Sequence, residues 1–198
     1  MTRADNQHSG GSPCPGWPGG GNGTSGTNGT NGTNGNKHRV TIGLLVYDRP
    51  GVLVRIAQVF SRRGSNIESL VVSPTNVRDT SRMTITSSGP EDVFQQIILQ
   101  LNKLVDVIHA RDHSMDQAVT RELALFKLGC NVEQRSEVLQ LAEVFRGKTI
   151  DISETTITVE ATGATEKIDA LGTMLAKFDL REMVRTGKVV MARGASVT

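Results

Sequence analysis

Two short segments of the sequence hold residues that could bind a small ligand. The first runs from Asp48 to Leu53 and reads Asp-Arg-Pro-Gly-Val-Leu, directly after an apolar stretch. A helix that begins there would present backbone N–H groups and the positive end of its dipole to a carboxylate. Gly51 would let a ligand approach the backbone closely, and the carboxylate of Asp48 could receive an ammonium group. The second segment, Gly64 to Glu68, leads into the next predicted strand.

The groups of the first segment suit one class of ligand. Anion-binding amides, one carboxylate and the aliphatic neighbours Val52 and Leu53 together favour a small zwitterion with an apolar side chain, which is an amino acid. The structural alternative is a helix start that Asp48 caps and whose glycine only permits packing, because turns of this composition are common. The residues alone leave both interpretations open.

Other chemistries are poorly represented in the sequence. It contains no phosphate-binding glycine loop, no dinucleotide-binding fingerprint and no nucleophile elbow. His109 and His113 are expected at the end of a strand, so solvent-facing side chains are favoured over a metal site. Cys130 has no His or Cys partner at motif spacing and is expected to be a buried, inert thiol. We therefore predict no catalytic residue, no metal and no cofactor held by this chain.

Composition excludes several classes of protein. The chain has 198 residues and a formal net charge of +2, with both signs interspersed. This balance argues against a strongly basic nucleic-acid-binding protein and against an acidic disordered chain. The predicted strand at 82–88 has no aromatic residue on which RNA bases could stack. We expect no nucleic-acid partner.

The sequence also argues against a membrane or secreted protein. Its longest apolar run, near Val40 to Tyr47, has the length of a strand and not of a membrane helix. No secretory signal is apparent, and two cysteines are too few for a disulfide framework. We expect no membrane association and a cytoplasmic location.

Residues 1–36 differ from the rest of the chain. They hold eleven of the 21 glycines and three of the six prolines, and residues 24–35 form a near-repeat of Thr, Asn and Gly. Such a segment has little apolar surface to offset the entropy of ordering its backbone. It is predicted to be a disordered leader.

The remaining residues predict two modules of the same kind. In the first, at 37–113, strands are expected at 39–47, 67–73, 82–88 and 105–110, with helices at 52–63 and from 89–92 to Leu104. Gly64 is expected to end the first helix. The order βαββαβ is the ferredoxin-like pattern of an α+β fold.

The second module, at 119–194, repeats the pattern more loosely. Strands are expected at 122–130, 149–153, 156–161, 183–184 and 188–192, with helices at 133–145 and 166–178. Residues 113–119 are the predicted joint. Modules this small bury a limited share of their surface and leave sheet edges open, so we expect at least a dimer.

One family shares several of these segments in order. The run LLVYDRPGVLVRIAQVFSRRGSNIESLVV resembles the ACT-domain signature of the small regulatory subunits of acetolactate synthase, also called acetohydroxyacid synthase. The resemblance continues through SRMTI, QLNKLVDV, RELALFKL, VFRGKTIDIS and TVEATG, and covers residues 38 to 194. The leader falls outside it.

The resemblance implies a regulatory and non-catalytic role. Subunits of this family activate a catalytic subunit that depends on thiamine diphosphate, with Mg²⁺ and FAD expected in that partner. They also confer feedback inhibition by branched-chain amino acids, usually valine, with leucine and isoleucine as further effectors. The family implies an ACT domain at 37–113, a C-terminal module at 119–194, and a homodimer formed through the ACT domains.

The resemblance also implies which residues bind the effector, since in this family it lies between two paired ACT domains. Asp48, Gly51, Val52 and Leu53 would come from one protomer, and Asn66 and Ile67 from the other. Some members have Asn where this chain has Asp48, and Asp would interact more strongly with an ammonium group.

Three other functions remain as alternatives. A free-standing amino-acid sensor with another partner would bind valine without activating a catalytic subunit. An enzyme in its own right would show turnover, and a nucleic-acid-binding protein would show a salt-dependent mobility shift.

Overall fold

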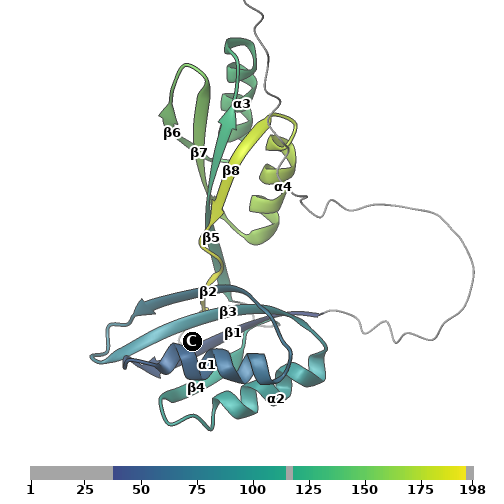
Figure 1. Ribbon diagram of the computed structural model, residues 1–198. Coiled ribbons are helices and arrows are strands. Elements are labelled where there is room, and N and C mark those ends of the chain that lie inside the picture. Colours follow the sequence, from purple (N-terminus) through teal and green to yellow (C-terminus); the bar gives the residue numbers. More distant parts are fainter. Residues whose placement is uncertain (1–37, 115–117, 195–198) are drawn as a thin grey trace, which may run out of the picture. The chain divides into compact units, whose positions relative to one another are not determined.

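The structure is a computed structural model that describes residues 38–114 and 118–194. The predicted leader at 1–36 and the middle of the predicted joint at 113–119 lie outside these residues. The described residues form two α+β modules, each with its elements in the order βαββαβ (Figure 1). The predicted pair of tandem ferredoxin-like modules is thus confirmed.

The first module is a four-stranded antiparallel sheet with both helices on one face (Figure 1). Its strand order is β2-β3-β1-β4. The elements are β1 (His38–Tyr47), α1 (Val52–Arg62), β2 (Ile67–Pro74), β3 (Thr80–Gly89), α2 (Glu91–Leu101) and β4 (Val107–Asp112).

Apolar periodicity explains which faces of these elements are buried. In β1, Ile42 and Leu44 point to the helix-covered face of the sheet and pair with Ile85 and Met83 of β3, while Thr41 and Gly43 between them point to the opposite face and are also buried. In α1, the buried residues recur every four positions, so one stripe packs on the sheet. Together with the buried stripe of α2 they make one core, whose helical members are Val52, Ile56, Phe60, Phe94, Ile97 and Leu101.

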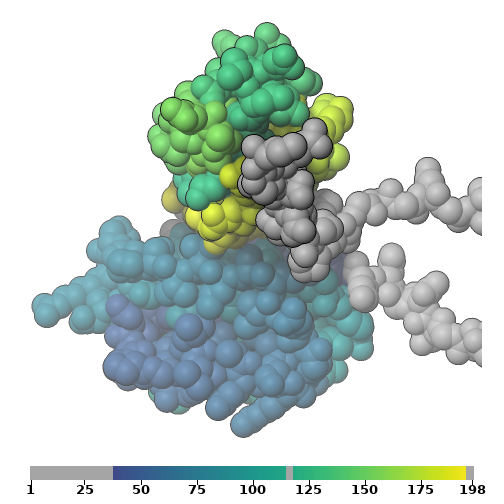
Figure 2. All heavy atoms as spheres, turned by 45° about the horizontal axis from the view of Figure 1, so that its top comes forward, coloured from purple at the N-terminus to yellow at the C-terminus, as the bar shows by residue number. Residues whose placement is uncertain are grey.

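The second module has the same topology and one extra strand. Its sheet has the order β6-β7-β5-β8, and β9 pairs with the beginning of β5. The elements are β5 (Val119–Gly129), α3 (Val132–Val144), β6 (Lys148–Ile152), β7 (Thr156–Gly163), α4 (Thr165–Leu175), β8 (Asp179–Arg185) and β9 (Val189–Met191). Phe126 of β5 lies at the centre of a separate core. In the space-filling view the first module is coloured purple to teal and the second green to yellow (Figure 2).

Some predicted boundaries were wrong, and the reasons are physical. The strand expected at 183–184 extends over Asp179–Arg185, because backbone pairing with β5 includes polar residues that periodicity does not mark. Leu104 and Phe178 were placed in helices but lie in the turns that follow them, where both still pack against a core. The strand expected at 188–192 pairs with β5 as β9.

Two predictions about single side chains had different outcomes. His113 was expected to face solvent, but it is 5% exposed, since its backbone N–H donates to the carbonyl of Thr41 and so places it against β1. Cys130 is a buried free thiol, as predicted. Within the described ranges, no helix has the length and apolar character needed to cross a membrane.

Candidate functional site

The turn between β1 and α1 is exposed and leads into a helix whose N-terminus no side chain caps. Asp48, Arg49, Pro50 and Gly51 are all exposed. Gly51 is the N-cap of α1, and no side chain caps the helix there. The prediction that Asp48 caps this helix is therefore wrong: Asp48 lies three residues too early. The N–H of Val52 donates to the carbonyl of Arg49 (3.3 Å), and the N–H groups of Leu53 and Val54, which lack partners within the helix, are left for another acceptor.

The backbone conformation at position 51 favours glycine over other residues. The φ of Gly51 is +86°, in the left-handed region that favours glycine. A Cβ built at this position would meet nothing within 4 Å. The space beside Gly51 is therefore open, and a ligand carboxylate could approach the backbone amides of α1 from it.

Two neighbouring loops fix the exposed turn. The backbone N–H of Asp48 donates to the carbonyl of Asp79 (2.9 Å), and that of Tyr47 donates to the carbonyl of Asp106 (2.9 Å). The Asp106 carboxylate also lies 2.6 Å from the guanidinium of Arg55 and 3.9 Å from that of Arg49. Asp106 was not predicted to support the turn, although an acidic residue inside the apolar run Leu-Val-Asp-Val is a sign of a buried, paired carboxylate.

The two aliphatic residues of the turn have different roles. Val52 is 3% exposed and packs in the core, and its backbone N–H donates to the carbonyl of Arg49 (3.3 Å), so neither its side chain nor its N–H is free for a ligand. Leu53 is 41% exposed and follows Gly51 by two residues in the sequence. Of the two, Leu53 alone can present an apolar wall to a ligand.

Asn66 and Ile67 lie at the beginning of β2. Asn66 is exposed, and its backbone carbonyl accepts a hydrogen bond from the hydroxyl of Ser87 (2.6 Å). The hydroxyls of Ser65 and Ser87 are also hydrogen-bonded to each other, at 2.8 Å. Ser87 is fully buried, and Ile67 pairs with it across the sheet. Sequence analysis missed Ser87, because a serine among alternating small polar residues carries no distinguishing signal.

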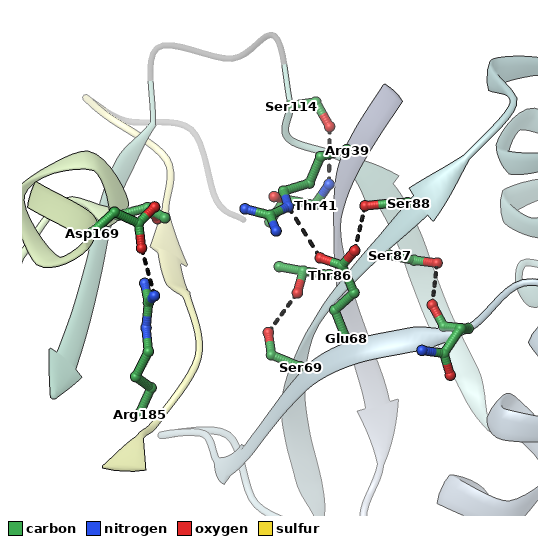
Figure 3. Close-up of polar contacts among 12 residues, drawn as sticks. Arg39, Thr41, Glu68, Ser69, Thr86, Ser87, Ser88, Ser114, Asp169 and Arg185 are labelled. Atoms are coloured by element: carbon green, nitrogen blue, oxygen red, sulfur yellow. Dashed lines mark hydrogen bonds and ion pairs between the residues drawn. The ribbon is translucent and has the colours of Figure 1, made fainter. Parts of the chain in front are cut away.

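A ladder of polar contacts continues along β2 and β3 from that point. The hydroxyls of Ser69 and Thr86 are 2.6 Å apart (Figure 3). Glu68 lies 3.0 Å from Arg39 and accepts a hydrogen bond from Ser88 (Figure 3). These contacts fix the register of the edge strand β2, which begins at Ile67.

One chain does not bring the two groups of predicted residues together. Along β3, Thr80 is paired with Tyr47 at the first group, and Ser87 is paired with Ile67 at the second. These two β3 residues are seven positions apart, which corresponds to about 23 Å of strand. A small amino acid cannot span that distance, so Asp48 and Asn66 of the same chain cannot hold one ligand.

The second module has an ion network. Arg185 of β8 pairs with Glu122 of β5 and, at 2.6 Å, with Asp169 of α4 (Figure 3). Burial lowers the pKa of Arg185, but its hydrogen bonds and charge interactions with Glu122 and Asp169 outweigh this effect, so its pKa is raised. Glu122 is 5% exposed and also accepts a hydrogen bond from Thr165 (2.8 Å). Every partner is internal, so the network ties α4 to the sheet.

Metal binding has no support within residues 38–114 and 118–194. No group of three or more His, Cys, Asp or Glu side chains is arranged there to hold an ion.

Comparison with known proteins gives consistent matches for both modules. A family model for the ACT domain of acetohydroxyacid synthase small subunits matches residues 42–109, and one for the small subunit of acetolactate synthase matches residues 121–194. The sequence is 46% identical over 154 residues to the acetolactate synthase small subunit of Mycobacterium bovis (strain ATCC BAA-935 / AF2122/97), covering 78% of this chain and 92% of that protein.

Similar proteins also occur in an archaeon and among solved structures. The probable acetolactate synthase small subunit of Methanothermobacter thermautotrophicus is 44% identical over 155 residues, which cover 78% of this chain and 92% of that protein. The crystal structure of the acetolactate synthase small subunit from Thermotoga maritima matches with a TM-score of 0.72 and 35% identity, covering 80% of this chain and 99% of that one.

Proposed function

Since this chain belongs to the family of acetolactate synthase small subunits, we propose that it is the regulatory subunit of such an enzyme. In this proposal it raises the activity of a catalytic subunit and makes that activity sensitive to valine. The chemistry, with thiamine diphosphate, Mg²⁺ and FAD, takes place on the partner. The proposed setting is the cytoplasm.

The observation that carries the proposal is the exposed, uncapped N-terminus of α1 at Gly51. A helix that has no side-chain cap and opens onto free space is suited to an external carboxylate. The exposed carboxylate of Asp48 precedes it by three residues and can receive the ammonium group of the same ligand. An α-amino acid carries these two opposite charges close together.

The proposed site is completed by a second copy of the chain. Asn66 and Ile67 of one copy lie beside Asp48, Gly51 and Leu53 of the other, and Val52 anchors the first turn of α1 in the core behind them. The separation of about 23 Å between the two groups within one chain supports this two-copy arrangement. The amide of Asn66 would hydrogen-bond the ligand carboxylate, and Ile67 would face its side chain.

The binding free energy expected for such a site is appropriate for a metabolite sensor. Feedback requires a dissociation constant of about 1 μM to 1 mM, which is a binding free energy of about −8 to −4 kcal/mol. An aliphatic pocket distinguishes side chains by only about 1–3 kcal/mol per methylene. Leucine and isoleucine are therefore also expected to bind, with binding free energies that differ from that of valine by no more than this amount per methylene.

The test is reconstitution with the catalytic subunit from the same organism. Acetolactate formation from pyruvate is measured with and without this chain and with and without valine. The proposal expects the chain to raise activity and valine to lower it. If the chain changes nothing, calorimetry of valine with the chain alone decides: binding without activation would identify a sensor for another partner.

A further inference from the structure

The carboxylate of Asp106 lies in a sparsely exposed position between β1 and α1. Asp106 is 7% exposed as a residue, and it directly precedes β4. A carboxylate removed from water to this degree needs charged or hydrogen-bonding partners, or its burial is costly. Its two charged partners are Arg55 at 2.6 Å and Arg49 at 3.9 Å.

These partners stand on both sides of Gly51. Arg49 lies within the turn, and Arg55 lies in the first turn of α1, where its N–H donates to the carbonyl of Gly51 (3.2 Å). Arg49 also stacks over the ring of Tyr47, at 5.2 Å from the ring centroid. The carboxylate of Asp106 therefore contacts the chain before and after the left-handed glycine.

The backbone of Asp106 contributes a third contact. Its carbonyl accepts the N–H of Tyr47, the last residue of β1, at 2.9 Å. One residue thus fixes the end of the strand through its carbonyl and the beginning of the helix through its carboxylate. The exposed segment between them, residues 48–51, has no side chain in the core.

We propose that Asp106 is a positioning residue, which holds the β1–α1 turn in the geometry that presents the α1 amides to the effector. This inference rests on the proposed function. Ordering a few exposed backbone residues before binding removes an entropic cost that the ligand would otherwise meet. Asp106 is not itself within the proposed site and acts through Arg55 and the Tyr47 backbone.

A direct electrostatic effect makes the opposite prediction for one substitution. If Asp106 acted only through its field, Asp106→Asn would remove a negative charge near the ligand carboxylate and leave binding equal or tighter. If Asp106 positions the turn, the same substitution weakens binding. Arg55→Gln weakens binding under both explanations, so the pair of variants separates them.

The experiment uses the full chain and two readouts. Hydrogen exchange of the amides of residues 49–54, except Pro50, which has no amide hydrogen, is measured without ligand, and valine affinity is measured by calorimetry. Asp106→Asn and Arg55→Gln are expected to speed exchange at these amides and to weaken valine binding about tenfold. Arg55→Lys is expected to retain part of the affinity, because it keeps the charge and loses the fork geometry.

Lys127→Gln is the matched control. Lys127 is exposed to the same degree as Arg55 (47% and 49% of the side chain) and pairs with Glu182 at 3.4 Å in the other module. It is expected to change neither readout.

The outcomes separate this inference from the proposed function. Unchanged exchange at 49–54 in both variants, or equal or tighter valine binding by Asp106→Asn, overturns the positioning role. Absence of valine binding by the unaltered chain overturns the proposed effector, and with it the link to Asp106. If Asp106→Asn does not fold, hydrogen exchange at the turn in Arg55→Gln against Lys127→Gln decides the case, with faster exchange in Arg55→Gln supporting the positioning role and unchanged exchange overturning it.

Discussion

Gly51 combines a left-handed backbone with open space, and this combination makes it the most informative single position in the chain. Gly51→Asp would place a carboxylate where the ligand carboxylate is proposed to bind. We expect valine inhibition to be lost, with affinity falling by at least about 100-fold, because like charges at close range cost several kcal/mol. Activation of the catalytic subunit should persist. Inhibition curves and calorimetry measure the two effects.

Gly51→Asn is the control for this prediction. Asparagine has nearly the same size as aspartate and tolerates the left-handed region equally well, but it carries no charge. It should lose less affinity than Gly51→Asp. Equal affinity in Gly51→Asp and the unaltered chain would show that the effector binds elsewhere.

Asn66 offers a second prediction, at the other group of proposed ligand contacts. Asn66→Ala should weaken valine binding by about 1–3 kcal/mol, the cost of a lost hydrogen bond to a charged group. The backbone contact from Ser87 uses the Asn66 carbonyl and survives the substitution. Gln100→Ala, which removes an exposed amide from α2, is the control for calorimetry. Wild-type affinity in Asn66→Ala would remove this residue from the site.

The turn proposed to bind the effector could be predicted from the sequence, but the residues that support it could not. Gly51 was recognisable because a proline and glycine after an apolar run predict a turn and a helix start. Asp106 and Ser87 were not, because each acts through a partner more than 20 positions away in sequence, and the pattern of one segment does not contain the other. The error over Asp48 has a local cause: the helix begins only after Gly51, whose left-handed backbone turns the chain.

Helices α3 and α4 differ in how they begin, and this difference is testable. Asn131 caps α3 in a reciprocal pair, since its side chain accepts the N–H of Gln134 (2.8 Å) and its own N–H donates to the Gln134 side chain (3.3 Å). Ala164 begins α4 with an extended backbone and no side-chain cap.

Removing the cap of α3 and adding a cap to α4 should change the free energy of unfolding in opposite directions. Asn131→Ala is expected to lower the free energy of unfolding by about 1 kcal/mol, and Ala164→Ser to raise it by a similar or smaller amount. Thermal unfolding of the full chain, followed by calorimetry, measures both. A fall in Tm with Ala164→Ser would contradict the capping argument, as would no change with Asn131→Ala.

The type and order of the helices and strands could be predicted from the sequence, but their first and last residues were harder to predict. The buried stripes of α1 and α2 follow the apolar spacing in the sequence, so both helices were placed within a few residues. Strand β8 was not, since its polar residues from Asp179 to Glu182 join the sheet through backbone pairing with β5. Local pattern does not encode which neighbour a polar segment will find.

Across the assembled protein, the proposed two-copy site predicts complementation between defective variants. In a mixed dimer of a Gly51→Asp chain and an Asn66→Ala chain, both substitutions fall in one of the two sites. The other site combines the unaltered Gly51 of one chain with the unaltered Asn66 of its partner. Mixtures should therefore contain sites with the affinity of the unaltered protein, which neither variant has alone.

Co-refolding the two variants and titrating valine tests this expectation. Two samples refolded separately and mixed just before the titration serve as the control, because their chains have not exchanged. If co-refolded samples bind no better than the separate ones, each site is built from a single chain and the proposed arrangement is wrong.

The distance between Asn66 and Gly51 along the sheet has one more consequence. A pocket shared between two copies exists only while the copies are joined, so valine binding and self-association reinforce each other. Such a subunit would respond to its own abundance as well as to the amino acid. In a dilute extract, inhibition by valine would be lost before catalytic activity is lost. Adding valine would promote reassociation of the separated chains.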